Sequence, residues 1–376
     1  MKPVLIIVGA SVRAAAQSAL RAGFAPYAID LFADRDLAAI CPAVRIKRYP
    51  RDFEPALRAA PQAPWIYTGG LENYPRLVAR LAAIRPLWGT GPDTLRKIRN
   101  PWRLQRELAA INHQVPPIYR AMNADPRGPM LHKPLRSSGG FRIRPASAAG
   151  PLSARRGWYY QSQVAGQSLG AVFASTGEAT VLLGVARQWQ GHDFGLENLP
   201  LAYVGSYAGP EMLDHHQRLQ PLGAAIAERF QLRGLWNVDL VADREKYWVL
   251  EVNPRYSASC EVLERATGVP LLPFHAAAFD SKHACSWSAP QPRPKIAVGK
   301  ATVYAPRGGV VPQSFDDLIA KWNDAPHWPI IADLPFIGAK IVANQPVATV
   351  FSRGESRADV ESALRERVQT VQCLIS

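Results

Sequence analysis

The sequence has few cysteines and no long apolar run. Four cysteines are scattered along 376 residues without close pairing: Cys41, Cys260, Cys285 and Cys373. This usage predicts a reducing cytoplasm and no designed disulfide or zinc site. No apolar run approaches the roughly 20 residues that span a bilayer. Residues 1–8 run directly into a strand-like segment without a cleavable leader pattern, so we expect no membrane association.

Two common nucleotide-binding signatures are also missing. The first strand-like segment, Lys2–Val8, is followed by Gly9-Ala10-Ser11 in place of Gly-x-Gly-x-x-Gly. A dehydrogenase therefore has little support, and Asp30 is interpreted as a strand-end residue and not as a ribose ligand. A Walker loop ending in Gly-Lys-Ser/Thr is absent as well.

Positive charge is in excess. Lys and Arg number 44 against 30 Asp and Glu, a formal net charge of +14. Such a balance attracts nucleic acid, an anionic membrane surface or a small polyanionic substrate. The arginines are spread along the chain and form no basic arm, which disfavours nucleic-acid binding. We therefore expect small-molecule substrates, at least one of them anionic.

The amino-terminal third has the pattern of a doubly wound sheet. Strand-like Lys2–Val8, helical Val12–Ala22 and strand-like Phe24–Leu31 follow one another. Trp65–Thr68 is a further strand, and the loop after it holds Glu72 and Asn73. Ligands of open α/β sheets bind beyond the carboxyl ends of strands, so these two side chains are candidates for holding a substrate amine. The alternative is that they satisfy free amides at a helix N-terminus.

An acidic hairpin stands out between residues 237 and 261. Two apolar runs flank a polar turn at residues 243–246, and Glu251 and Asn253 share one face of the second strand. Asp239 on the first strand can meet them across the ladder. An all-oxygen cluster suits Mg²⁺ or Mn²⁺. Arg255 follows, placed to neutralise phosphate. The alternative is an ordinary hairpin with a polar, solvated face.

A second feature combines a lysine with a loop of small residues. The apolar strand Met130–Pro134 carries Lys133, and Ser137, Ser138, Gly139 and Gly140 follow. Small residues let backbone amides approach phosphate oxygens, and the lysine supplies a point charge. The combination indicates a phosphate-binding loop.

Glu-Val-Asn-Pro-Arg at residues 251–255 resembles the metal-binding motif of the ATP-grasp superfamily. The segments Gly9–Ala19, Ala28–Asp34 and Gly69–Asn73 resemble one branch of it, the predicted ATP-dependent carboligases related to biotin carboxylase. Some members of that branch accompany genes for one-carbon carrier coenzymes of the tetrahydromethanopterin and methanofuran type. The resemblance implies an α/β, in part α+β, ATP-grasp fold and binding of ATP with Mg²⁺.

The resemblance also implies roles for individual residues. Lys133 and the loop Ser138, Gly139 and Gly140 would contact nucleotide phosphate. The strand Trp158–Gly166 resembles the hinge of the family, in which Gln161 and the backbone of Val164 would read adenine, and Ser168 falls where relatives bind ribose. The metal ligands implied are Asp239, Glu251 and Asn253. Catalytic roles fall to Lys133, Arg187 and Arg255, and substrate contacts to Glu72, Asn73 and Ser257.

Residues Leu95–Ala110 are expected to form one basic helix, in a place where the family has a phosphate-contacting base. Either Arg99 or Arg103 matches that position, but solvated helix residues are the preferred interpretation of both. Three domains are expected: a Rossmann-like pre-ATP-grasp domain over residues 1–95, the ATP-grasp domain over 96–288 with its lid at about 117–166, and a small β-rich domain over 295–376.

The expected function is an ADP-forming carboxylate–amine ligase, with acyl phosphate as intermediate. The coenzyme association points to a glutamyl or amino-acid substrate. Two alternatives stay open, a carboxylase acting through carboxyphosphate and a catalytically silent nucleotide-binding protein. A homodimer is left open as the assembly.

Overall fold

The computed structural model describes residues 2–121, 128–146, 156–243, 246–283, 287, 292–323 and 328–375. The amino-terminal part is a four-stranded parallel sheet of order β3-β2-β1-β4. Its strands are β1 (Val4–Gly9), β2 (Ala25–Asp30), β3 (Ala43–Arg45) and β4 (Trp65–Tyr67). Its helices are α1 (Arg13–Arg21), α2 (Arg35–Ile40), α3 (Phe53–Ala59), the 3₁₀ turn η1 (Leu71–Asn73) and α4 (Pro75–Ala82).

Strand β1 is buried on both faces, which explains its continuous apolar run. Leu5 and Ile7 pack into a core shared with α1, whereas Ile6 and Val8 pack into a second core shared with α3 and α4. Asp30 ends β2, and its carboxylate accepts hydrogen bonds from backbone amides of the neighbouring turns. The expected doubly wound unit and the strand-end role of Asp30 are both confirmed.

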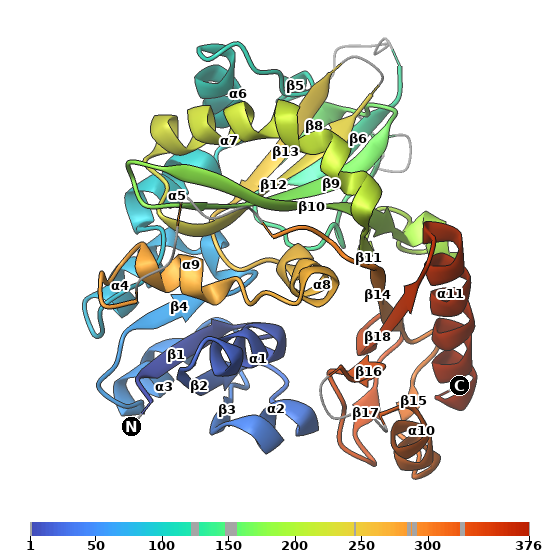
Figure 1. The fold of residues 1–376 in the computed structure, drawn as a ribbon. Helices are drawn as coiled ribbons and strands as arrows, with labels where there is room; N and C mark the ends of the chain where they lie inside the picture. The colour runs from blue at the N-terminus through green and yellow to red at the C-terminus, as the bar shows by residue number, and fades with distance from the viewer. Residues whose placement is uncertain are drawn as a thin grey trace.

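The centre of the molecule is an eight-stranded antiparallel sheet of order β13-β12-β9-β10-β11-β14-β18-β16. The strands are β9 (Gln167–Ser175), β10 (Thr180–Gln190), β11 (Tyr203–Ala208), β12 (Gly234–Ala242), β13 (Tyr247–Asn253), β14 (Ala297–Tyr304), β16 (Ile331–Ala332) and β18 (Pro346–Gly354). The helical segments between them are η3 (Gly191–Phe194), η4 (Pro210–His215), α7 (His216–Phe230), α8 (Ala258–Thr267) and α9 (Leu272–Ala277). Helix α7 crosses one face of this sheet, and α8 and α9 lie between the other face and the amino-terminal sheet (Figure 1).

A smaller antiparallel sheet of order β5-β8-β6-β7 lies in the region where a lid is predicted. Its strands are β5 (Ile118–Tyr119), β6 (Met130–Pro134), β7 (Arg144–Pro145) and β8 (Trp158–Ser162). Residues 122–127 and 147–155 of the predicted lid lie outside the described part of the chain. Residues 244–245 of the predicted hairpin turn also lie outside it.

The single helix expected over Leu95–Ala110 is wrong. The chain forms α5 (Pro92–Ile98) and α6 (Pro101–Ala109), separated at Arg99 and Asn100. Pro101 disfavours a helical conformation of the residue before it, and it suits the first position of a new helix. The Asn100 side chain accepts a hydrogen bond from the Arg103 amide at 3.1 Å and caps α6. Arg99 is therefore the C-cap residue of α5 and not part of a continuous helix.

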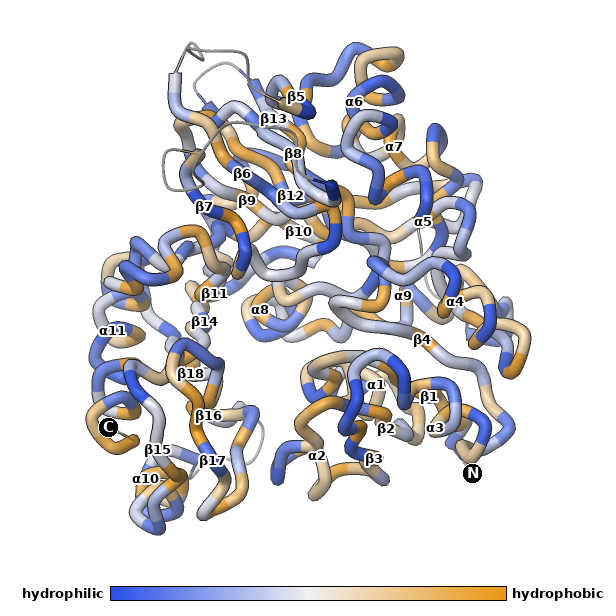
Figure 2. The backbone as a smooth tube through the Cα atoms, turned by 180° about the vertical axis from the view of Figure 1, so that it is seen from behind, coloured by the Kyte–Doolittle hydropathy of each residue, from blue (hydrophilic) through white to orange (hydrophobic). Residues whose placement is uncertain are grey.

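The carboxyl-terminal part extends the central sheet. Strand β14 pairs with β11 on one side and with β18 on the other. The remaining elements are β15 (Gly309–Val310), α10 (Ser314–Trp322), β17 (Lys340–Ile341) and α11 (Arg357–Leu374). Seen from behind, β15, β17 and α10 lie at the bottom of the molecule, next to the amino-terminal sheet (Figure 2). No helix within the described ranges is long and apolar enough to cross a membrane.

Candidate active site

A cavity of about 420 Å³ lies where the amino-terminal sheet, the small β5-β8-β6-β7 sheet and the central sheet meet. Its lining combines the loop after β6, the facing strands β12 and β13, and the turns after β1 and β4. Most of the sequence-predicted site residues line it, namely Lys133, Ser138, Gly139, Gly140, Ser168, Asp239, Glu251, Asn253, Arg255 and Ser257.

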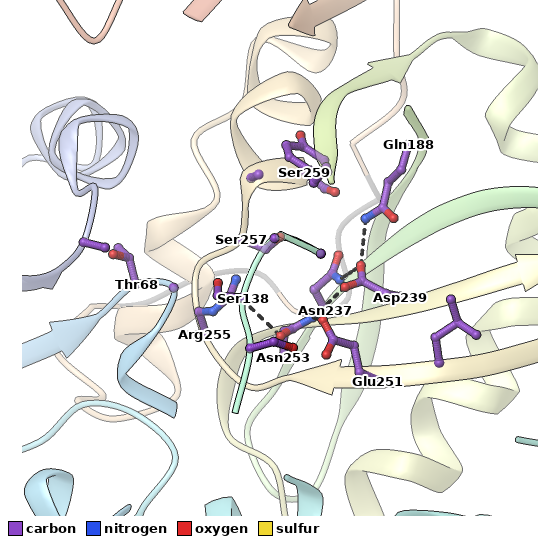
Figure 3. Close-up of a pocket in the computed structure, with 18 of the residues that line it drawn as sticks. Thr68, Ser138, Gln188, Asn237, Asp239, Glu251, Asn253, Arg255, Ser257 and Ser259 are labelled. Atoms are coloured by element: carbon purple, nitrogen blue, oxygen red, sulfur yellow. Dashed lines mark hydrogen bonds between the residues drawn. The ribbon is translucent and has the colours of Figure 1, made fainter. Parts of the chain in front are cut away.

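The acidic hairpin has the predicted register. Asp239 on β12 is paired with Glu251 on β13, and Asn237 is paired with Asn253. Because side chains two apart share a strand face, all four point to the cavity (Figure 3). The Asn253 amide nitrogen donates to Asp239 Oδ2 at 2.7 Å and to Glu251 Oε1 at 3.1 Å. The hairpin therefore gathers two carboxylates and two amides into one cluster.

The two carboxyl groups titrate differently. Burial, and then the charge of Glu251, raise the pKa of the Asp239 carboxyl to about 7. Burial also opposes ionisation of Glu251, but the charges of Arg99 and Lys133 outweigh it and lower the pKa of that carboxyl to about 2. A cation beside the pair would favour full ionisation of both carboxyl groups.

This cluster fits a hard divalent cation. Its donors are carboxylate and amide oxygens, the ligands that Mg²⁺ takes in proteins. Asn237 Oδ1 is buried and has no hydrogen-bond partner in the described part of the chain, although such atoms are normally satisfied. Glu251 keeps 36% of its side chain exposed towards the cavity. Asp239, Glu251 and Asn253 are thus suitable ligands, and Asn237 is a further oxygen that the sequence analysis did not use.

The loop after β6 forms the other wall. Gly139 and Gly140 have φ angles of +64° and +73°, in the left-handed region that favours glycine. A Cβ atom on Gly140 would lie 2.2 Å from the carbonyl oxygen of Leu201, so the backbones approach too closely for any side chain. The Tyr203 amide donates to the Gly139 carbonyl at 2.8 Å and ties this loop to β11.

Arg255 is held from the amino-terminal sheet. Its Nη2 donates to Glu72 Oε1 at 2.9 Å and to Asn253 Oδ1 at 3.1 Å. Glu72 is 1% exposed and is not part of the cavity lining. Glu72, which is predicted to hold a substrate amine, balances the charge of Arg255 in this structure.

Arg99 lies in the site, although it is predicted from the sequence to be exposed to solvent. Its guanidinium donates to Glu251 Oε2 at 3.1 Å, to Asn73 Oδ1 at 2.9 Å and to the Ser137 carbonyl at 3.1 Å. The preferred interpretation as a solvated helix residue is therefore wrong for Arg99, whereas Arg103 on α6 is 43% exposed. The Asn73 amide also donates to the Ser137 carbonyl at 3.0 Å. Asn73 thus positions Arg99 and the loop, outside the cavity lining.

Three other predicted residues lie outside the cavity lining. Gln161 is buried, and its Oε1 accepts from Lys133 Nζ at 2.8 Å, so it orients the lysine. Val164 follows on the loop between β8 and β9. Arg187 is on β10 beside Gln188, and neighbours on a strand point to opposite faces. It is Gln188 that faces the cavity and donates to Asp239 Oδ1 at 2.7 Å.

A charged network closes the far end of the cavity. Arg13, at the start of α1, donates to Glu261 of α8 and to Asp333 Oδ1, the latter at 2.8 Å. Lys300 of β14 donates to Glu261 Oε2 at 3.1 Å. Ser257 is the N-cap residue of α8 and lines the same cavity. No local sequence pattern links these residues, since they come from separate parts of the chain.

Comparisons of the sequence with known proteins match its central part to one domain family. The model of the ATP-grasp domain family matches residues 98–259. A stretch of 48 residues is 40% identical to the carbamoyl phosphate synthase large chain of Clostridium acetobutylicum, covering 13% of this chain and only 4% of that one.

Solved structures match over almost the whole chain. The L-amino acid ligase of Bacillus licheniformis has a TM-score of 0.69 at 13% identity, with 98% of each chain covered. The biotin carboxylase domain of the Hydrogenobacter thermophilus 2-oxoglutarate carboxylase, in complex with MgADP and bicarbonate, has a TM-score of 0.68 at 14% identity, covering 93% of this chain and 86% of that one. At such identities the likeness concerns the fold. Residues 98–259 of the chain match the ATP-grasp domain family, and the chain as a whole has the fold of the ligase and of the biotin carboxylase domain.

Proposed function

We propose that this protein is an ATP-dependent ligase that joins a carboxylate to an amine and releases ADP and phosphate. The observation that carries the proposal is that Asp239, Glu251 and Asn253 line the same cavity as Lys133 and Arg255. Two carboxylates with an adjacent amide suit a divalent cation, and the two basic side chains suit phosphate. The similar structures include an L-amino acid ligase and a biotin carboxylase domain with bound MgADP, which agrees with this chemistry.

In the proposed reaction, a carboxylate oxygen of the substrate attacks the γ-phosphorus of ATP, and ADP leaves. The amine nitrogen then attacks the acyl carbon, phosphate leaves, and the nitrogen loses a proton. A bound Mg²⁺ would neutralise charge on the phosphates. Lys133 and Arg255 stabilise the charge that develops on the transferred group, a role that needs no protein nucleophile. Arg99 contacts Glu251 and adds a third positive charge, beside the acidic hairpin.

The substrate class is a finer proposal. Lys300 and Arg13 at the far end of the cavity suit a substrate carboxylate, and Glu261 and Asp333 suit an amine. An amino acid or a glutamyl compound carries both groups, which agrees with a role in one-carbon carrier coenzyme biosynthesis. Gln161 and Val164 stay predictions for the adenine end, and Ser168 for ribose.

The test is a phosphate-release screen with ATP, Mg²⁺ and a panel of amino acids and glutamyl compounds. We expect release that depends on an amine acceptor, and a loss on the order of 100-fold or more in Glu251→Gln. Glu178→Gln makes the same chemical change on an exposed hairpin turn and should keep full activity.

Activity that survives Glu251→Gln would overturn the metal assignment. Release of phosphate with bicarbonate in place of an amine, together with incorporation of labelled bicarbonate, would favour the carboxylase alternative, which the bicarbonate-bound relative supports. No release with any substrate would favour a silent nucleotide-binding protein.

A further inference from the structure

A second cavity, of about 640 Å³, lies on the outer side of the η1 turn. Among the described residues that line it are five arginines and no carboxylate: Arg51, Arg76, Arg80, Arg96 and Arg136. The lining shares no residue with that of the active-site cavity. Its volume falls in the range of small-molecule pockets, roughly 300–1,000 Å³.

The arginines come from four separate segments. Arg51 precedes α3, Arg76 and Arg80 lie on α4, Arg96 lies on α5, and Arg136 lies in the loop after β6. Helices α4 and α5 pack against each other (Figure 1). The fold therefore brings these arginines together at one cavity, although they do not form a basic run in the sequence.

Little of this charge is neutralised by the protein. Arg80 pairs with Glu54 at 2.8 Å, and Arg96 pairs with Asp93. Arg51, Arg76 and Arg136 form no ion pair within the described part of the chain. Pro75 begins α4 at the same hollow, so the positive end of that helix adds to the potential.

We propose that this arginine pocket binds a polyanionic small molecule with closely spaced phosphate or carboxylate groups. Planar guanidinium groups donate in pairs to such oxyanions, and arginine is the side chain best suited to this geometry. The proposal assigns a location to part of the net charge of +14, which the catalytic cavity does not explain.

The bound anion would also act on the active site through the loop after β6. Arg136 faces the arginine pocket with its guanidinium 5.9 Å from the ring centre of Tyr74, and the next residue, Ser137, faces the catalytic cavity. The Ser137 carbonyl is held by Asn73, which immediately precedes Tyr74. An anion bridging Arg76 and Arg136 would therefore fix this loop against the amino-terminal sheet.

The test is a calorimetric titration with inorganic tripolyphosphate, and in parallel with citrate, in EDTA. Lys133→Met serves as background because it weakens phosphate binding in the catalytic cavity. We expect one site per chain, with affinity that falls as salt rises. In that background Arg51→Ala with Arg76→Ala should weaken binding at least tenfold. Tripolyphosphate bound more tightly indicates a phosphorylated ligand, and citrate bound more tightly indicates a polycarboxylate.

The matched control is Arg45→Ala with Arg353→Ala, which removes the same charge from exposed positions outside the pocket. It should leave the affinity within about twofold, since distant surface charges are screened. Hydrogen exchange of residues 135–140 should slow when the probe binds. Equal weakening by both double variants, or no binding of either probe, would overturn the proposal. Because no turnover is measured, this outcome is independent of the ligase assignment.

Discussion

At the scale of single residues, Asp239 is the most constrained group of the site. Its carboxylate accepts from three side-chain amides, those of Gln188, Asn237 and Asn253, each at 2.7 Å. Such outer contacts fix the orientation of a ligand oxygen and commonly change metal affinity by about 10- to 100-fold when removed. Positions that touch no substrate can therefore set the affinity of the site.

Gln188→Leu is expected to weaken the apparent affinity for Mg²⁺ about tenfold, because Asp239 loses one of its orienting donors. The measurement is a Mg²⁺ titration of the binding of a fluorescent ATP analogue. The neighbouring change Arg187→Ala, on the opposite strand face, is the control and should leave the Mg²⁺ titration unchanged. If Arg187→Ala weakened the Mg²⁺ affinity and Gln188→Leu did not, Arg187 and not Gln188 would belong to the site.

At the scale of elements, the contact between α7 and the central sheet depends on one glycine. Phe173 of β9 stacks on Trp236 of β12 with ring centres 4.5 Å apart. A Cβ atom on Gly223 of α7 would lie 2.0 Å from the Phe173 ring. The ring is fully buried, so it cannot move aside without disturbing the core.

Gly223→Ala is therefore expected to destabilise the protein by about 1–3 kcal/mol, the usual cost of overpacking. The gain in helix propensity, about 1 kcal/mol, is smaller than the clash. Urea denaturation measures the change in the free energy of unfolding. In a Phe173→Leu background the same substitution should cost less, because the ring is gone. An equal cost in both backgrounds would contradict the steric explanation.

At the scale of the whole molecule, Arg13 joins three parts of the chain. Its guanidinium links α1 of the amino-terminal part to Glu261 of α8 and to Asp333 of the carboxyl-terminal part. The arginine side chain is 3% exposed and that of Glu261 is 4% exposed. Breaking a buried ion pair on one side leaves the remaining charge uncompensated.

Arg13→Met should lower the free energy of unfolding by about 3–5 kcal/mol. Arg35→Met breaks a more exposed pair with Asp316 and should cost no more than about 1 kcal/mol. Chemical denaturation compares the two variants. Addition of Asp333→Asn should recover part of the loss in Arg13→Met, because one of the unpaired charges is removed. Equal effects at Arg13 and Arg35 would argue against a buried network.

The sequence was informative where spacing along one strand or one loop decided the geometry. Asp239, Glu251 and Asn253 were predicted because alternation on a hairpin is a local rule, and Lys133 with its glycine loop is equally local. The doubly wound arrangement of the amino-terminal sheet was predicted from the apolar runs of its strands. These features need no knowledge of distant contacts.

Residues that act across segments could not be predicted in this way. Arg99 contacts Glu251 only because the chain breaks between α5 and α6, a break that Pro101 signalled and that the expectation of one helix overlooked. Gln188 meets Asp239 through the pairing of β10, β9 and β12, which no local pattern specifies. Its position one residue from Arg187 shows how an error of one place reverses a strand face.

The pairing of β11 with β14 limits how this chain can be divided. Residues 98–259 match the family, but β14 begins at Ala297, beyond that region, and supplies the neighbour of β11. An excised 98–259 fragment would expose the backbone donors and acceptors of β11 as an open edge, a template for intermolecular association. It would also lose Glu72 and leave Arg255 without its carboxylate. The smallest autonomous unit is therefore larger than the family-defining segment.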